Sequence, residues 1–82
     1  MSSGSNAASL MSRMVAFELA CRFTDEEVRL GVSVALENLR AALASNGLCN
    51  GPRDSTFFDR VLSGSASTAE VVPYVMARAE DA

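Results

Sequence analysis

The chain has 82 residues, of which 49% are hydrophobic, and its formal net charge is −3 with no histidine and no lysine. A chain of this length forms one small domain that buries only about 60% of its unfolded surface, so a partner that adds stability is an option from the outset. The acidic balance argues against nucleic-acid binding, and the absence of histidine removes the commonest general base and the histidine dyads of nucleophilic catalysis.

Residues 1–8 are small and polar, and we predict a disordered N-terminal segment there, followed by a single helical domain over residues 9–80. The start of the chain lacks the basic and apolar regions of a signal peptide, and no apolar run reaches the roughly 18 residues of a membrane span. A cytoplasmic or nuclear location without membrane contact is therefore expected. The lack of lysine and isoleucine beside abundant alanine and arginine indicates a GC-rich bacterial or viral coding sequence.

A first helix is expected from about Ala7 or Ala8 to Arg22. Its main apolar line repeats at helical intervals and comprises Leu10, Met14, Phe17 and Cys21. Leu19 lies off this line, so the helix has more apolar surface than packing against one neighbouring element requires. Met11 and Met14 allow two interpretations, since they can fill gaps in a small core or form an adaptable binding surface. The junction to the next helix has almost no linker, and Phe23 is the predicted wedge there.

The element around which we expect the fold to be organised is one long amphipathic helix over about residues 25–46. Thr24 is its predicted N-cap in a capping box, and Gly47 is the left-handed residue beyond its end. Its predicted core face consists of Val28, Val32, Ala35, Leu36, Leu39, Ala42 and Leu43. Residues 28–34 also alternate like a strand, but the caps favour a helix, in which Gly31 costs about 1 kcal/mol and indicates close approach by a neighbour.

A second apolar line on this long helix comprises Leu30, Val34 and Ala41 and is broken by Glu37. It lies near the face opposite the predicted core side. A helix on the outside of a monomer needs only one apolar stripe. The three side chains can therefore touch a short neighbouring segment of the same chain, or they can contact another chain, and the sequence leaves both interpretations open.

A short third helix is predicted after a turn at residues 49–52. It is expected to begin at a cap formed by Asp54 or Ser55 and to close at Gly64. The adjacent phenylalanines of this helix, Phe57 and Phe58, point about 100° apart. One of them can pack in the core while the other reaches a flank or a partner.

A fourth helical segment is predicted to open with a capping box at residues 67–70 and to continue to about Glu80. Pro73 falls inside this segment. A proline there either kinks the helix or marks its proper start as the first helical residue.

The two cysteines do not form a disulfide framework, although a single bridge between Cys21 and Cys49 stays open. Cys21 is interpreted as a small core residue. Two cysteines without histidine cannot supply a structural zinc site, and no phosphate-binding glycine loop is present. We therefore expect no catalytic residues, no metal, no cofactor and no enzymatic activity.

These patterns predict an all-α fold, a small bundle of three to four helices packed around the long helix at residues 25–46. The expected function is that of a protein–protein interaction module, namely an adaptor, an assembly subunit or an inhibitor of a larger partner. It would act by burying apolar helix faces, and a homodimer is the closest variant. The predicted interface comprises Leu30, Val34, Ala41, Phe57 and Phe58, with Arg29, Glu37 and Arg40 among its charged residues.

The alternative is a small regulatory DNA-binding protein of helix-turn-helix layout. The order of short, long and short helices is also similar in layout to histone-fold subunits, which dimerise through a long middle helix. Such a protein would show salt-dependent affinity for duplex DNA.

Overall fold

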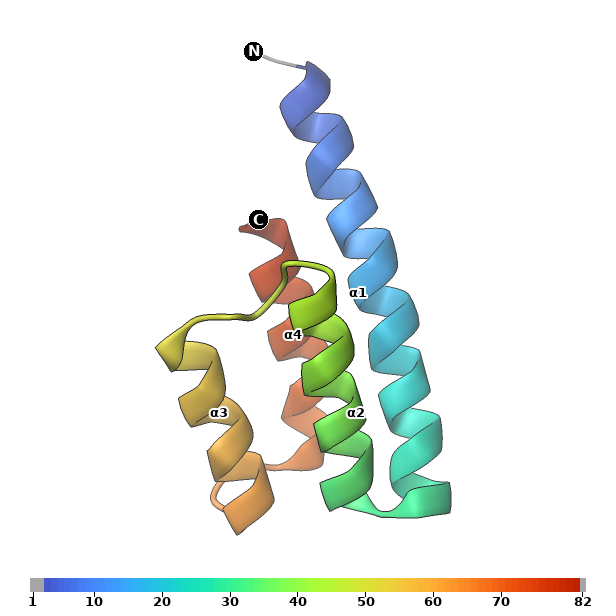
Figure 1. Ribbon diagram of the computed structural model, residues 1–82, viewed down its shortest axis with the longest axis vertical. Coiled ribbons are helices and arrows are strands. Elements are labelled where there is room, and N and C mark those ends of the chain that lie inside the picture. Colours follow the sequence, from blue (N-terminus) through green and yellow to red (C-terminus); the bar gives the residue numbers. More distant parts are fainter. Residues whose placement is uncertain (1–2, 82) are drawn as a thin grey trace.

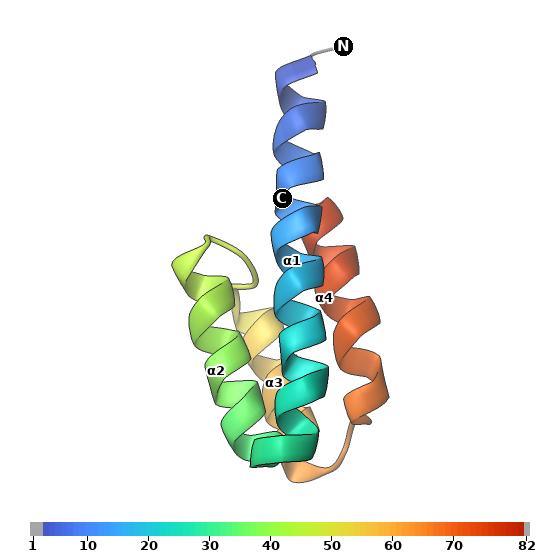
Figure 2. The ribbon, with the colours of Figure 1, turned by 90° about the vertical axis from the view of Figure 1, so that its right-hand side faces the viewer.

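The computed structural model describes residues 3–81, with side chains described from Leu10 to Asp81, and these residues form four helices and no strand (Figure 1). The helices are α1 (Ser3–Leu30), α2 (Val32–Ser45), α3 (Pro52–Ser63) and α4 (Val71–Glu80), and a 3-10 turn, η1 (Thr68–Glu70), leads into α4. Successive helices alternate in direction, as in an up-and-down bundle. α1 packs against α2 and α4 (Figure 2), and the predicted all-α fold class is confirmed.

The long helix predicted over residues 25–46 is divided in the structure into two antiparallel helices. α1 continues to Leu30, and Gly31 alone separates it from α2. Gly31 has φ 94° and ψ 157°, a backbone conformation that is essentially restricted to glycine. The predicted cap at Thr24 is wrong, because Thr24 lies inside α1 and its hydroxyl donates to the carbonyl of Ala20 at 3.2 Å.

The N-terminal half of the chain differs from prediction in one further way. Phe23, the predicted wedge at a helix junction, is a buried residue inside α1. The predicted disorder of residues 1–8 stays a prediction, because Met1 and Ser2 lie outside the described residues, while α1 begins at Ser3.

The predicted end of the second helix is confirmed in detail. Gly47 has φ 71°, and the N–H of Leu48 donates to the carbonyl of Leu43 at 2.8 Å. Together with the bond from Gly47 to Ala44, this is the Schellman pattern that satisfies the last carbonyls of a helix. Gly64, with φ 86°, closes α3 in the same way.

The starts of the last two helices follow local sequence rules. α3 begins one residue after Gly51, earlier than the predicted Asp54 or Ser55 cap, with Pro52 as its first residue. The predicted capping box at residues 67–70 is confirmed, since the Ser67 N–H donates to the Glu70 carboxylate at 2.9 Å.

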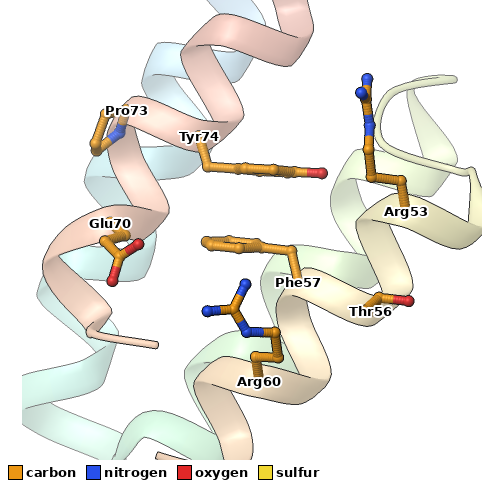
Figure 3. Close-up of a pocket in the computed structure, with 7 residues that line it drawn as sticks. All are labelled: Arg53, Thr56, Phe57, Arg60, Glu70, Pro73 and Tyr74. Atoms are coloured by element: carbon orange, nitrogen blue, oxygen red, sulfur yellow. The ribbon is translucent and has the colours of Figure 1, made fainter. Parts of the chain in front are cut away.

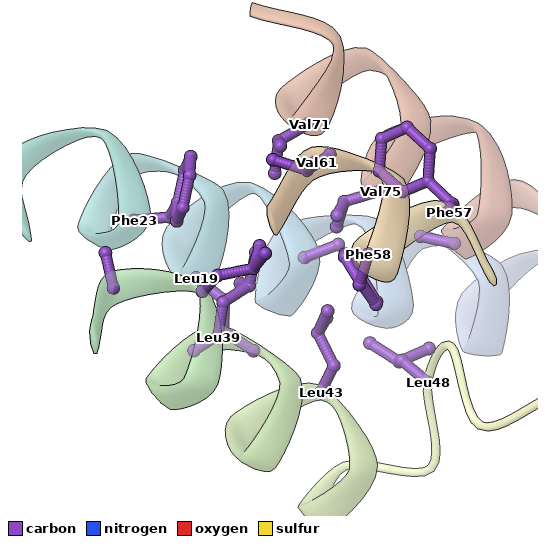
Figure 4. Close-up of a cluster of buried hydrophobic side chains, with 14 of the residues drawn as sticks. Leu19, Phe23, Leu39, Leu43, Leu48, Phe57, Phe58, Val61, Val71 and Val75 are labelled. Atoms are coloured by element: carbon purple, nitrogen blue, oxygen red, sulfur yellow. The ribbon is translucent and has the colours of Figure 1, made fainter. Parts of the chain in front are cut away.

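The core contains residues from all four helices (Figure 4). Its largest fully buried apolar side chains are Phe23, Phe58, Leu36, Leu43, Val71 and Val75. The predicted core face of the second helix is confirmed at Ala35, Leu36, Leu39 and Leu43. Val28 was predicted on the same face but is 84% exposed, because it belongs to α1 and the reversal at Gly31 turns it away from the core.

Candidate protein-interaction surface

An apolar stripe runs along the outer side of α1. It comprises Leu10, Met14, Phe17, Cys21 and Val28, and we call it the α1 stripe. Its members are separated by steps of four, three, four and seven residues, and Thr24 divides the last step into three and four. This alternation keeps one side of a helix facing a neighbouring helix along its whole length. Met14 and Phe17 are nevertheless 63% and 58% exposed.

The core is reached by a different side of α1. Ala16, Leu19, Ala20 and Phe23 are buried, in an arrangement that recurs every three or four residues. Figure 2 shows α2 and α4 flanking α1 and α3 behind it, so the outward side of α1 is uncovered. The sequence interpretation had these two sides reversed. Cys21, predicted in the core, is exposed, whereas Leu19, predicted as surplus coverage, is buried.

The apolar residues of the predicted interface are divided between surface and core. Leu30 and Val34 are 46% and 48% exposed, and Ala41 is exposed as well. These three lie at the end of α1 and on the outside of α2. Phe57 and Phe58 are both largely buried in the single chain.

The charged residues of the predicted interface have different surroundings. Arg29 forms an exposed ion pair with Asp25 at 2.8 Å within α1. Arg40 is half-buried and reaches Asp59 of α3 at 3.5 Å, so it helps to hold α2 to α3. Glu37 is exposed. A hollow of about 320 Å³ is lined by Ser33, Glu37, Arg40 and Leu62.

A larger groove, of about 760 Å³, lies between α3 and α4 (Figure 3). It is lined by Arg53, Thr56, Phe57, Arg60, Glu70, Pro73 and Tyr74. The rings of Phe57 and Tyr74 stack in the space between the two helices, with centroids 3.9 Å apart and planes inclined by 9°. The groove is therefore shaped by the side chains that join α3 to α4.

Asp54 adds a buried charge to this junction. Its carboxylate accepts hydrogen bonds from the Tyr74 hydroxyl at 2.6 Å, from Arg78 Nε at 2.8 Å and from the Gly51 N–H at 3.1 Å. Burial alone would raise the pKa of Asp54, but these donors outweigh it and lower the pKa below its ordinary value. The ion pair is fully hydrogen-bonded and joins α3 to α4.

The sequence had identified Asp54 only as a possible helix cap. Its partners, Tyr74 and Arg78, are 20 and 24 residues away in the sequence. No local pattern connects an aspartate in a first helical turn with an arginine on another helix. The cluster could be found only once α3 and α4 had been placed side by side.

The remaining chemistry of the described part of the chain is sparse. Both cysteines are free, so the Cys21–Cys49 bridge that the sequence left open is not formed. Burial and the neighbouring Asp54 raise the pKa of Cys49 to about 11, which makes it a poor nucleophile at neutral pH. Within residues 3–81, no three acidic or cysteine side chains gather as metal ligands would. None of the helices in that range is both long enough and apolar enough to cross a membrane.

Comparisons with models of known protein families, with curated proteins and with solved structures found no match to this chain. Its function is therefore inferred from its surfaces. Of these, the α1 stripe carries several large exposed apolar side chains in a spacing that fits a second helix.

Proposed function

We propose that the protein is an interaction module that docks onto a protein partner through the α1 stripe. The observation that carries this proposal is the exposure of Met14, Phe17 and Val28 on a helix whose other side is already packed in the core. Adaptors, assembly subunits and inhibitors all use a surface of this kind.

The energetics favour a covered stripe. Burying a side chain such as leucine, methionine, phenylalanine or valine contributes roughly 1.5–3 kcal/mol relative to leaving it in water. Aromatic residues and methionine are also enriched in interfaces, and Phe17 and Met14 lie next to each other at the middle of the stripe. The exposed charges of Arg13, Glu18 and Arg22 flank it, as in the polar rim of an interface.

The middle of the stripe, at Phe17 and Cys21, lies on a stretch of α1 that is already packed before any partner binds. Ala16, Leu19 and Phe23 fix the inner side of the same helix in the core, so the outer side chains start from a formed helix. A partner does not have to supply the free energy of ordering the backbone. This rigidity distinguishes the stripe from a disordered binding segment.

The line predicted from the sequence is a weaker candidate. Leu30 and Val34 are about half exposed, but the third member of the line is only an alanine. Glu37 and Asn38 lie exposed beside it on α2. The methyl group of Ala41 contributes less apolar area than the side chain of Phe17 or Met14, and polar side chains interrupt the line on which it lies.

Site-specific photo-crosslinking tests the proposal. A photoreactive benzoylphenylalanine would replace Met14 in one chain and, as the matched control, the exposed Ala77 of α4 in another, both produced in the native host. Illumination should give protein adducts heavier than the free chain from position 14 and not from position 77. The absence of adducts at position 14, or equal adducts at both positions, would overturn the proposal.

A further inference from the structure

We infer that the partner of the α1 stripe is a second copy of the same chain, with the two α1 helices antiparallel. In this arrangement residue 19 of one copy is level with residue 19 of the other, so that residues whose numbers sum to 38 face each other. This inference rests on the proposed function and names the partner.

The sizes of the stripe side chains carry the inference. The N-terminal half of the stripe has the large residues Leu10, Met14 and Phe17, and the C-terminal half has the smaller Cys21, Thr24 and Val28. In the antiparallel register Leu10 lies level with Val28, Met14 with Thr24, and Phe17 with Cys21. Each layer then joins one large and one smaller side chain, which keeps the distance between the helix axes even.

The other ways of pairing two copies fit less well. A parallel pair would place Leu10, Met14 and Phe17 against themselves at one end and Cys21 against itself further along. The helices would then be forced apart at one end and underpacked at the other, and both defects cost stability. A one-residue shift along the axis would displace the facing side chains by about 1.5 Å and spoil the match of large and smaller side chains in each layer.

The charges on one flank of the stripe are complementary in the same register. Arg13 of each copy lies within one helical turn of Glu27 of the other on one flank. On the opposite flank, Glu18 of each copy lies within one turn of both Arg22 and Glu18 of the other, so an attractive and a repulsive contact offset each other there. The Arg13–Glu27 pair joins opposite charges and occurs twice in a symmetric dimer, and charged residues beside an apolar seam set partner choice and orientation.

The shape of the molecule allows this contact. The N-terminal end of α1 extends beyond the ends of the other helices (Figures 1 and 2). In an antiparallel pair the two extensions point in opposite directions, and each lies beside the C-terminal half of the other α1. The interface is two-fold symmetric and closes on itself, so it makes a dimer and not a filament. The stripe is about 27 Å long, which favours a reversible dimer.

Sedimentation equilibrium from about 1 µM to about 1 mM protein tests the dimer. The wild-type chain should pass from monomer to dimer over this range. Phe17→Glu should remain a monomer, because it places a charge in the apolar stripe. Its helical circular dichroism should be unchanged, because Phe17 is exposed in the single chain. The matched control is Leu62→Glu, an exposed leucine outside the stripe, which should dimerise like the wild type. A wild-type chain that stays monomeric at the highest concentration would overturn the inference.

Disulfide cross-linking tests the orientation. One chain carries Leu10→Cys with Cys21→Ser, and the other carries Val28→Cys with Cys21→Ser. Diamide takes two protons and two electrons from a pair of facing thiols and becomes a hydrazine, while the thiols form a disulfide. The mixture should give the mixed disulfide, and each chain alone should give none above the Cys21→Ser background. Cross-linking of either chain alone would show a parallel pair and overturn the inference.

The two proposals fail in distinguishable ways. If the photo-adducts at position 14 contain a different protein and the wild-type chain is a monomer, the stripe is a docking surface but its partner is not a second copy. If position 14 gives no adduct and the chain is a monomer, both proposals fail.

Discussion

The ring of Tyr74 lies flat on the ring of Phe57, and its hydroxyl donates to the buried carboxylate of Asp54 at 2.6 Å. Tyr74 thus joins α4 to α3 with both its apolar ring and its polar end. Arg78, one turn further along α4, donates to the same carboxylate. A charged and aromatic cluster of this kind should control how α3 is held, and its contribution can be measured separately from that of the α1 stripe.

We expect Asp54→Asn to lower the free energy of unfolding by about 2 kcal/mol, because it removes the charge from a buried, multiply hydrogen-bonded pair. Chemical denaturation followed by circular dichroism would measure the change. The matched control is Asp59→Asn, also in α3, whose carboxylate is 70% exposed and 3.5 Å from Arg40. That change should cost less than about 1 kcal/mol. Equal losses in the two variants would contradict the assigned role of Asp54.

The pKa of Tyr74 can be observed directly, because it is the chain's one tyrosine. Burial, the hydrogen bond to Asp54 and the negative charge of Asp54 raise its pKa to about 12. Ultraviolet titration of the phenolate should therefore have its midpoint near 12 in the folded protein and near about 10 in denaturant. In Asp54→Asn the folded midpoint should fall. An unchanged midpoint would show that Asp54 does not raise the pKa.

The stability of the protein should fall at acid pH through Asp54. The folded pKa of this carboxyl lies below its unfolded value of about 3.9, so its contribution is fully present well above that value. It is lost as the pH falls from there through the folded pKa. The difference in unfolding free energy between the wild type and Asp54→Asn should therefore shrink below about pH 4. A difference that stays constant down to low pH would contradict this assignment.

Gly31 should be sensitive to any L side chain although its neighbourhood is open. Nothing would lie within 4 Å of an added Cβ, but the φ of +94° strains an L-residue. We expect Gly31→Ala to cost about 1–3 kcal/mol in the free energy of unfolding. The matched control is a synthetic chain with D-alanine at this position, which accepts positive φ and should retain the wild-type stability. If L-alanine and D-alanine at this position lowered the free energy of unfolding equally, the loss would not come from the backbone conformation, and the explanation would be contradicted.

The sequence predicted the helix ends that depend on local chemistry. Gly47, Gly64 and the capping box at residues 67–70 form as expected, because each needs only neighbouring residues to satisfy the ends of a helix. Thr24 carried a similar capping signal but lies inside α1. Its hydroxyl bonds to the preceding turn, so the same residue suits either position, and Gly31 is where the backbone reverses.

The division between core and surface could not be predicted from the α1 sequence alone. Leu10, Met14 and Phe17 form a regular apolar line, and so do Ala16, Leu19, Ala20 and Phe23. Both lines satisfy the periodicity of a core-facing helix. The choice depends on where α2 and α4 lie, and the small alanines at 16 and 20 let them approach that side of α1.

The two thiols should react at very different rates in the folded protein. Cys21 is exposed on the α1 stripe, whereas Cys49 is half-buried and its pKa is raised to about 11. With its pKa raised to about 11, Cys49 remains almost entirely a thiol at pH 8, and the thiolate is the reactive form. In dilute solution, Ellman's reagent should release one equivalent of chromophore rapidly and a second slowly. Cys49→Ser should remove the slow phase and Cys21→Ser the fast one.

If the α1 stripe pairs with a second copy, the fast phase should slow as the protein concentration rises, since Cys21 is then covered by Phe17. A rate for Cys21 that does not depend on concentration would count against that contact.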